Sequence, residues 1–172
     1  MPVVILVGAS GSGKSTIAKA IAELFPEAIE VLFFDSIGVP STETMTTECG
    51  SVEDWQRAKT SEWMQRLAPL SSSGRNVILE GQMRLSFVSE GASAAGLYSY
   101  LPILIDCDDV TRARRLIVDR QQPELASDDM MKWAAYLRAE ALYSGCDVLD
   151  TSMMSIEEAV SYVAQRSLSA LP

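Results

Sequence analysis

A glycine-rich stretch near the start of the chain restricts the possible folds more than any other feature. Residues 8–16 read GASGSGKST and directly follow an apolar run at residues 3–7. Glycine tolerates unusual dihedral angles and carries no obstructing side chain, so such a loop can wrap its backbone N–H groups around a polyphosphate. The pattern G-x-x-x-x-G-K-[ST] after a strand therefore predicts a phosphate-binding loop, followed by a helix whose positive end points at the phosphates.

Individual loop positions have predicted tasks in nucleotide binding. We expect Lys14 to reach the β- and γ-phosphate oxygens and the Ser15 hydroxyl to bind the Mg²⁺ ion that bridges them. After the loop, apolar residues recur at helical spacing until Pro26, which gives the strand–loop–helix context that a chance match would lack. The predicted nucleotide-binding residues are Gly8, Ser10, Gly11, Ser12, Gly13, Lys14, Ser15 and Thr16.

Composition limits what else the chain can do. Its length of 172 residues favours a single domain over residues 1–172. The formal net charge of −9 disfavours nucleic-acid partners and attraction to anionic membranes. No apolar run approaches transmembrane length and the start of the chain has no basic region, so we expect a cytoplasmic protein. The chain has no histidine, which leaves carboxylates, arginines and a metal–nucleotide complex to carry any catalysis.

Apolar runs alternate with helical periods along the chain. Further strands are predicted near residues 28–34, 76–79, 101–107 and 146–149, which makes the chain an α/β domain with a five-stranded parallel sheet flanked by helices. Helices are predicted near residues 51–68, 85–96, 108–120, 127–142 and 155–168. Residues 37–50 lack a clear period and are predicted to form a loop over the site. The buried stripe of helix 108–120 is expected to be Val110, Ala113, Leu116 and Ile117.

Acidic residues follow two of the predicted strands. Asp35 follows the second strand, and Glu80 follows the third, with Arg84 four residues later. The carboxyl ends of parallel strands face the ligand crevice, so these side chains should lie beside the phosphate-binding loop. We expect Glu80 to hold or orient Mg²⁺, Asp35 to orient or deprotonate an acceptor hydroxyl, and Arg84 to bind an anionic group.

Two further features have both a functional and a structural interpretation. Trp55 could stack on a substrate ring, although tryptophans at helical spacing more often belong to the core. The only dense basic cluster consists of Arg112, Arg114, Arg115 and Arg120, and such a cluster can also be a solvated helix face.

With these pieces in place, the sequence resembles the P-loop kinases that phosphorylate small molecules, such as adenylate, shikimate and gluconate kinases and chloramphenicol phosphotransferase. Residues 80–84, EGQMR, are similar to their D-G-x-P-R element, and residues 138–151 are similar to the end of shikimate-kinase-like chains. The resemblance implies a three-layer P-loop NTPase fold, with ATP as co-substrate and Mg²⁺ as cofactor. It also implies an acceptor-binding insertion at residues 36–70 and a short lid at residues 120–128.

The resemblance also assigns roles to individual residues. Arg115 and Arg120 correspond to lid arginines that close over the transferring phosphoryl group, and with Lys14 and Asp35 they complete the predicted catalytic set. Arg138 lies beside the lid, and with Asp35, Arg84 and Trp55 it is predicted to bind substrate. The chain lacks the G-G-G and complete D-x-D motifs of shikimate kinase, and its short lid excludes a long-lid adenylate kinase.

The leading hypothesis is an ATP-dependent phosphotransferase that acts on a small hydroxyl compound, such as a nucleoside, sugar or antibiotic. A nucleoside-monophosphate kinase is the alternative that Arg84 favours, because its guanidinium suits an anionic acceptor. A regulatory ATPase without an acceptor belongs to another class, and the chain has no N-K-x-D motif for guanine specificity. An inactive interaction module would not need Lys14 and Ser15. We expect a monomer or a homodimer.

Overall fold

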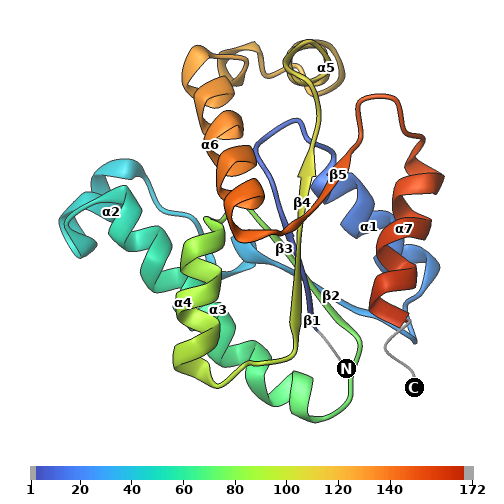
Figure 1. The fold of residues 1–172 in the computed structure, drawn as a ribbon. Coiled ribbons are helices and arrows are strands. Elements are labelled where there is room, and N and C mark those ends of the chain that lie inside the picture. Colours follow the sequence, from blue (N-terminus) through green and yellow to red (C-terminus); the bar gives the residue numbers. More distant parts are fainter. Residues whose placement is uncertain (1–2, 169–172) are drawn as a thin grey trace.

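The computed structural model describes residues 3–168, in which five parallel strands form one sheet in the order β2-β3-β1-β4-β5 (Figure 1). The strands are β1 (Val3–Val7), β2 (Glu30–Phe33), β3 (Val77–Gly81), β4 (Tyr100–Asp106) and β5 (Asp147–Asp150). β1 is the central strand, and all five of its residues are buried. A central parallel strand is covered on both faces, which explains why residues 3–7 form a continuous apolar run.

Helices cover both faces of the sheet, so the domain has three layers (Figure 1). One face carries α1 (Lys14–Leu24) and α7 (Ile156–Leu168), and the other carries α3 (Val52–Ser72), α4 (Leu85–Ala95) and α6 (Asp128–Ser144). Val4 and Leu6 of β1 belong to the core on the side of α1 and α7. Val3, Ile5 and Val7 belong to the opposite core. The predicted three-layer α/β fold with a parallel sheet is confirmed.

Residues 42–49 form a helix, α2 (Thr42–Cys49), and the predicted loop over this range is wrong. The side chain of Ser41 caps this helix by accepting a hydrogen bond from the Thr44 N–H at 3.2 Å. Met45 is the one buried residue of α2. A helix that buries a single side chain has no apolar period, so the sequence pattern gave no sign of it.

α3 passes through Pro69 and ends at Ser72, beyond the end predicted at residue 68. Proline lacks an N–H group and costs a helix one backbone hydrogen bond. The final turn keeps a backbone hydrogen bond from the Ser73 N–H to the Pro69 carbonyl at 3.1 Å, and the Ser72 hydroxyl adds one to the carbonyl of Ala68 at 3.0 Å. Neither α3 nor any other helix within the described residues has the length and apolar character needed to cross a membrane.

The segment after β4 differs most from its prediction. It consists of α5 (Asp109–Arg114) and the π-helical η2 (Arg115–Asp119), followed by the short η3 (Pro123–Leu125). Of the predicted apolar stripe only Leu116 is fully buried, whereas Val110 is 81% exposed and Ile117 also faces solvent. Arg112, by contrast, is 0% exposed. The prediction failed because an arginine can be buried where the fold supplies partners for its guanidinium.

Candidate active site

The phosphate-binding loop lies between β1 and α1, at the carboxyl end of the central strand. Gly13 precedes α1 with a φ of 96°, a left-handed conformation that residues with a Cβ atom disfavour. Gly8 is required for a different reason, because a Cβ atom there would lie 2.4 Å from the carbonyl oxygen of Ile105. The loop therefore depends on glycine both where it leaves the strand and where it enters the helix.

Two loop residues contact Glu80, at the end of the neighbouring strand β3. The Lys14 ammonium lies 3.5 Å from Glu80 Oε1, and the Ser15 hydroxyl donates a hydrogen bond to the same oxygen at 2.9 Å. The side chains of the ion pair are each 8% exposed. These residues meet because Leu6 of β1 lies opposite Glu80 in the sheet. The two residues predicted to bind Mg²⁺ are thus adjacent.

Charged groups around Lys14 act on its pKa in opposite directions. Burial lowers the pKa of Lys14 from its ordinary value of 10.5, the Glu80 carboxylate raises it, and the Arg120 guanidinium lowers it. Asp35, in η1 (Phe34–Ile37) after β2, also raises it. Asp35 and Arg120 therefore both lie within electrostatic range of Lys14. Their side chains are exposed, and neither forms an ion pair with another described residue.

A cavity of about 330 Å³ opens beside the loop. Its walls come from the loop and α1, from the α5–η2 segment and from the connection between β5 and α7. Arg115 and Arg120 make one side polar, whereas Ile17, Met154 and Ile156 make the other apolar. A cavity of this kind can hold the nucleoside part of a nucleotide whose phosphates lie on the loop.

Arg115 is held against the back of the phosphate-binding loop. Its Nη1 donates to the carbonyl oxygens of Gly11 and Ser12 at 3.3 and 3.2 Å and to the Thr151 hydroxyl at 2.9 Å. Its Nη2 donates to the Thr151 carbonyl at 2.8 Å. The Arg115 guanidinium was predicted to close over a phosphoryl group. In the structure its hydrogen bonds go to the loop and to the β5–α7 connection.

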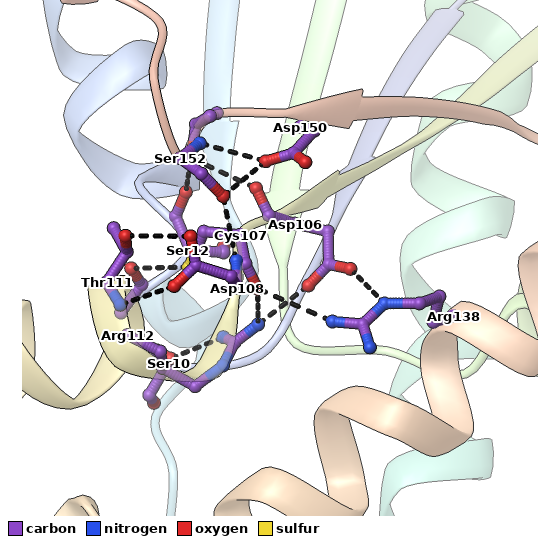
Figure 2. A network of polar contacts seen from close by, with 12 residues as sticks. Ser10, Ser12, Asp106, Cys107, Asp108, Thr111, Arg112, Arg138, Asp150 and Ser152 are labelled. Atoms are coloured by element: carbon purple, nitrogen blue, oxygen red, sulfur yellow. Dashed lines mark hydrogen bonds and ion pairs between the residues drawn. The ribbon is translucent and has the colours of Figure 1, made fainter.

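Asp106, at the end of β4, joins two arginines that lie far apart in the sequence (Figure 2). Its Oδ1 accepts a hydrogen bond from Arg112 Nη2 at 2.7 Å, and its Oδ2 accepts one from Arg138 Nε at 2.6 Å. The carboxylate raises the pKa of Arg138. Arg138, predicted to bind substrate, is thus paired within the protein. Like Asp35, Asp106 is an acid at the end of an apolar run. The same pattern could therefore have identified Asp106 as a candidate residue.

A second cavity, also about 330 Å³, lies between α3, the segment that follows β3, and α6. It is lined by Val52, Glu53, Gln56, Gln82, Arg84 and Trp133. Gln82 connects this cavity to the loop, because its Oε1 accepts a hydrogen bond from the Ser10 hydroxyl at 3.4 Å. Gln56 Nε2 donates to the carbonyl of Gln82 at 2.9 Å.

Among the described residues that line this second cavity, Arg84 is the one cation, and Glu53 neutralises it. Arg84 Nη2 donates to Glu53 Oε2 at 2.8 Å. The guanidinium also lies 5.0 Å from the ring centroid of Tyr136 and 5.7 Å from that of Trp133, both on α6. Two donors, Arg84 Nε and Trp133 Nε1, are buried without a hydrogen-bond partner among the described residues. No sequence signal singled out Glu53 or Trp133.

Trp55 is 5% exposed and belongs to the hydrophobic core. Its ring packs edge-on against Phe34, with 6.2 Å between the ring centroids. This packing leaves almost no ring surface free to stack on a substrate, so the structure gives the predicted stacking role no support.

The sequence model of a family described as an AAA domain matches residues 4–142. No curated protein sequence matches the chain significantly.

Solved structures of kinases share the whole fold. A shikimate kinase from Acinetobacter baumannii, in complex with shikimate, has 17% identity and a TM-score of 0.65, with 100% of this chain and 96% of that chain covered. A gluconokinase from Sinorhizobium meliloti has 17% identity and a TM-score of 0.66, with 98% and 94% covered. A sugar kinase from a Janibacter species has 20% identity and a TM-score of 0.64, with 100% and 96% covered. The predicted likeness to P-loop small-molecule kinases is confirmed at the level of the fold.

Proposed function

This chain belongs to the AAA domain family and has a kinase-like P-loop fold, and we propose that it is an ATP-dependent phosphotransferase acting on a small acceptor with a hydroxyl group. The observation that carries the proposal is the contact of Lys14 and Ser15 of the loop with Glu80 of β3, together with one cavity lined by loop residues and a second cavity linked to the loop through Gln82. Two separate cavities, one beside the phosphate-binding loop and one linked to it by the Ser10–Gln82 hydrogen bond, suit a reaction with two substrates. A hydrolase would need only the nucleotide cavity.

In the proposed reaction the residues mainly position the substrates and neutralise charge. Lys14 and the loop N–H groups would bind the β- and γ-phosphates of ATP. The Ser15 hydroxyl and the Glu80 carboxylate form a set of hard oxygen donors, which fits Mg²⁺ with Glu80 acting through a bound water. When bound there, Mg²⁺ would supply positive charge to the phosphate oxygens. Arg120, with its unpaired guanidinium, would stabilise the charge of the transferring group.

Asp35 is the proposed partner of the acceptor hydroxyl. The acceptor oxygen forms a bond to the γ-phosphorus while the bond from that phosphorus to the β-phosphate oxygen breaks, and the electron pair leaves with ADP. The hydroxyl proton passes to the Asp35 carboxylate. Asp35 is suited to this task because its exposed carboxylate acts electrostatically on Lys14 without an ion-pair partner.

The second cavity is the proposed acceptor site. Oxygen atoms of an acceptor could satisfy the unpaired donors Arg84 Nε and Trp133 Nε1, and Glu53 could accept hydrogen bonds from its hydroxyl groups. Because Glu53 already pairs with Arg84, the cavity favours a neutral acceptor over a nucleoside monophosphate. Similarity to kinases named for sugar and gluconate agrees with a hydroxyl acceptor.

The test is release of ADP from Mg·ATP in the presence of matched acceptors. Each nucleoside is compared with its 5′-monophosphate and each sugar with its acid, with Lys14→Ala as the blank and Lys19→Ala, on the exposed side of α1, as the matched control. We expect release that depends on a neutral acceptor, is lost in Lys14→Ala and is kept in Lys19→Ala. Release that no acceptor stimulates would favour the regulatory ATPase. An unchanged acceptor KM in Arg84→Ala would exclude an acceptor whose anionic group binds Arg84.

A further inference from the structure

Three successive carbonyl oxygens of the phosphate-binding loop accept hydrogen bonds from arginines of the segment after β4. Arg112 Nη1 donates to the carbonyl of Ser10 at 2.9 Å. Arg115 Nη1 donates to the carbonyls of Gly11 and Ser12 at 3.3 and 3.2 Å. The back of the loop is thus covered by two guanidinium groups, which lie one turn apart on the same helical segment.

Arg112 is the more unusual of the two, because it is fully buried. Its remaining bonds go to Asp106 Oδ1 at 2.7 Å and to the Cys107 carbonyl at 3.2 Å, as Figure 2 shows. Its side chain also packs against the loop, since a Cβ atom on Gly11 would lie 3.1 Å from Arg112 Cγ. A buried ion pair adds little stability compared with apolar residues of similar size, so the packing alone does not require an arginine here.

We infer that Arg112 is a positioning residue that holds the phosphate-binding loop in its anion-binding conformation before the nucleotide arrives. In a trans peptide group the carbonyl and the following N–H point in opposite directions. A Ser10 carbonyl fixed on Arg112 therefore turns the Gly11 N–H away from Arg112, towards the concave side of the loop. The Ser12 carbonyl, fixed by Arg115, does the same for the Gly13 N–H.

Preorganisation of these donors increases affinity for an anion, because the loop does not have to be ordered when the phosphates bind. Asp106 contributes to this preorganisation, because its carboxylate fixes the Arg112 guanidinium and compensates its buried charge. The inference rests on the proposed nucleotide binding, but it concerns a residue that touches neither the phosphates nor the acceptor.

Binding of inorganic tripolyphosphate and of adenosine, measured separately by titration calorimetry with Mg²⁺ present, tests the inference. In Arg112→Met we expect about tenfold weaker binding of tripolyphosphate, equivalent to about 1.4 kcal/mol, and adenosine affinity within about twofold of the wild type. Arg75→Met removes a different arginine ion pair, to Glu30, and serves as the matched control with both affinities unchanged. A merely structural role of Arg112 would lower the melting temperature without this selective loss of anion affinity.

Arg112→Lys keeps the inference testable if Arg112→Met does not fold. The lysine ammonium can pair with Asp106 but cannot also reach the Ser10 carbonyl, so tripolyphosphate binding should still weaken severalfold. Wild-type tripolyphosphate affinity in a folded Arg112→Met or Arg112→Lys variant would overturn the inference while leaving the proposed function intact. If the wild-type protein binds neither ATP nor tripolyphosphate, the inference and the proposed function both fail.

Discussion

The buried ion pair between Lys14 and Glu80 gives a prediction whose size can be worked from the structure. The two charged atoms are 3.5 Å apart, and Coulomb's law at an effective dielectric constant of about 20 gives about 5 kcal/mol of attraction at that distance. Desolvation of the two groups offsets much of this attraction. Removing one partner leaves the other buried and unpaired, so Glu80→Gln should lower the free energy of unfolding by about 3 kcal/mol.

A double-mutant cycle isolates this interaction. Glu80→Gln keeps an oxygen that can accept the Ser15 hydrogen bond, and Lys14→Met keeps the aliphatic stem of the lysine. The double variant buries no unpaired charge, so it should lose less stability than the sum of the single variants by about 2 to 3 kcal/mol.

The cycle is measured by urea denaturation of the nucleotide-free protein, followed by tryptophan fluorescence. The slopes of the unfolding transitions should agree among the four proteins, which shows that the same folded and unfolded states are compared. Effects that add to within about 0.5 kcal/mol would refute the reasoning, because they would mean that the two charges do not interact.

Three other outcomes follow from pKa shifts and from one close contact. Burial lowers the pKa of Lys14 in the folded protein below its ordinary value of 10.5. At a pH between the folded and the unfolded pKa, the unfolded chain binds more protons, so the free energy of unfolding should rise with pH. Denaturation experiments should show this rise in the wild type and not in Lys14→Met. Burial raises the pKa of Cys146 to about 11, so at pH 8 its alkylation by iodoacetamide, followed by mass spectrometry, should be much slower than that of glutathione; equal rates would contradict this. Gly8→Ala places a Cβ atom 2.4 Å from the Ile105 carbonyl oxygen. Calorimetry should therefore show a lower melting temperature, with a loss of about 1–3 kcal/mol in the free energy of unfolding. An unchanged melting temperature would show that the strand and loop shift freely.

Features that depend on nearby residues could be predicted from the sequence. The capping box of α7 is an example, because Glu158 N–H donates to the Ser155 hydroxyl at 3.2 Å and Ser155 N–H donates to the Glu158 carboxylate at 2.8 Å. The phosphate-binding loop is another, since its glycines and Lys14 are contiguous. The parallel sheet followed from the alternation of apolar runs and helical periods, which is also a local signal.

The second cavity could be predicted only in part, because its geometry depends on which segments the fold brings together. Arg84 was found from the acid four residues before it, but nothing nearby shows that Glu53 neutralises its charge. Trp55 and Trp133 illustrate the same limit. Both lie on helices, yet Trp55 faces the core and Trp133 lines the second cavity, and this difference depends on packing between α3, α4 and α6.

The arginines after β4 show why helical periodicity failed for the segment that contacts the phosphate-binding loop. A period assigns residues to a buried or an exposed face by their polarity, and it would always assign an arginine to solvent. The partners that reverse this assignment for Arg112 include the Asp106 carboxylate, six positions earlier, and the carbonyl of Ser10, 102 positions away in the chain. Arg112 and Arg115 both donate to loop carbonyls, whereas Arg120 of the predicted lid forms no ion pair with another described residue and lowers the pKa of Lys14. The members of the arginine cluster therefore differ: Arg112 and Arg115 bond to the loop, Arg114 pairs with Asp119, and Arg120 is the one that we propose faces the phosphates. Only the folded arrangement separates these roles.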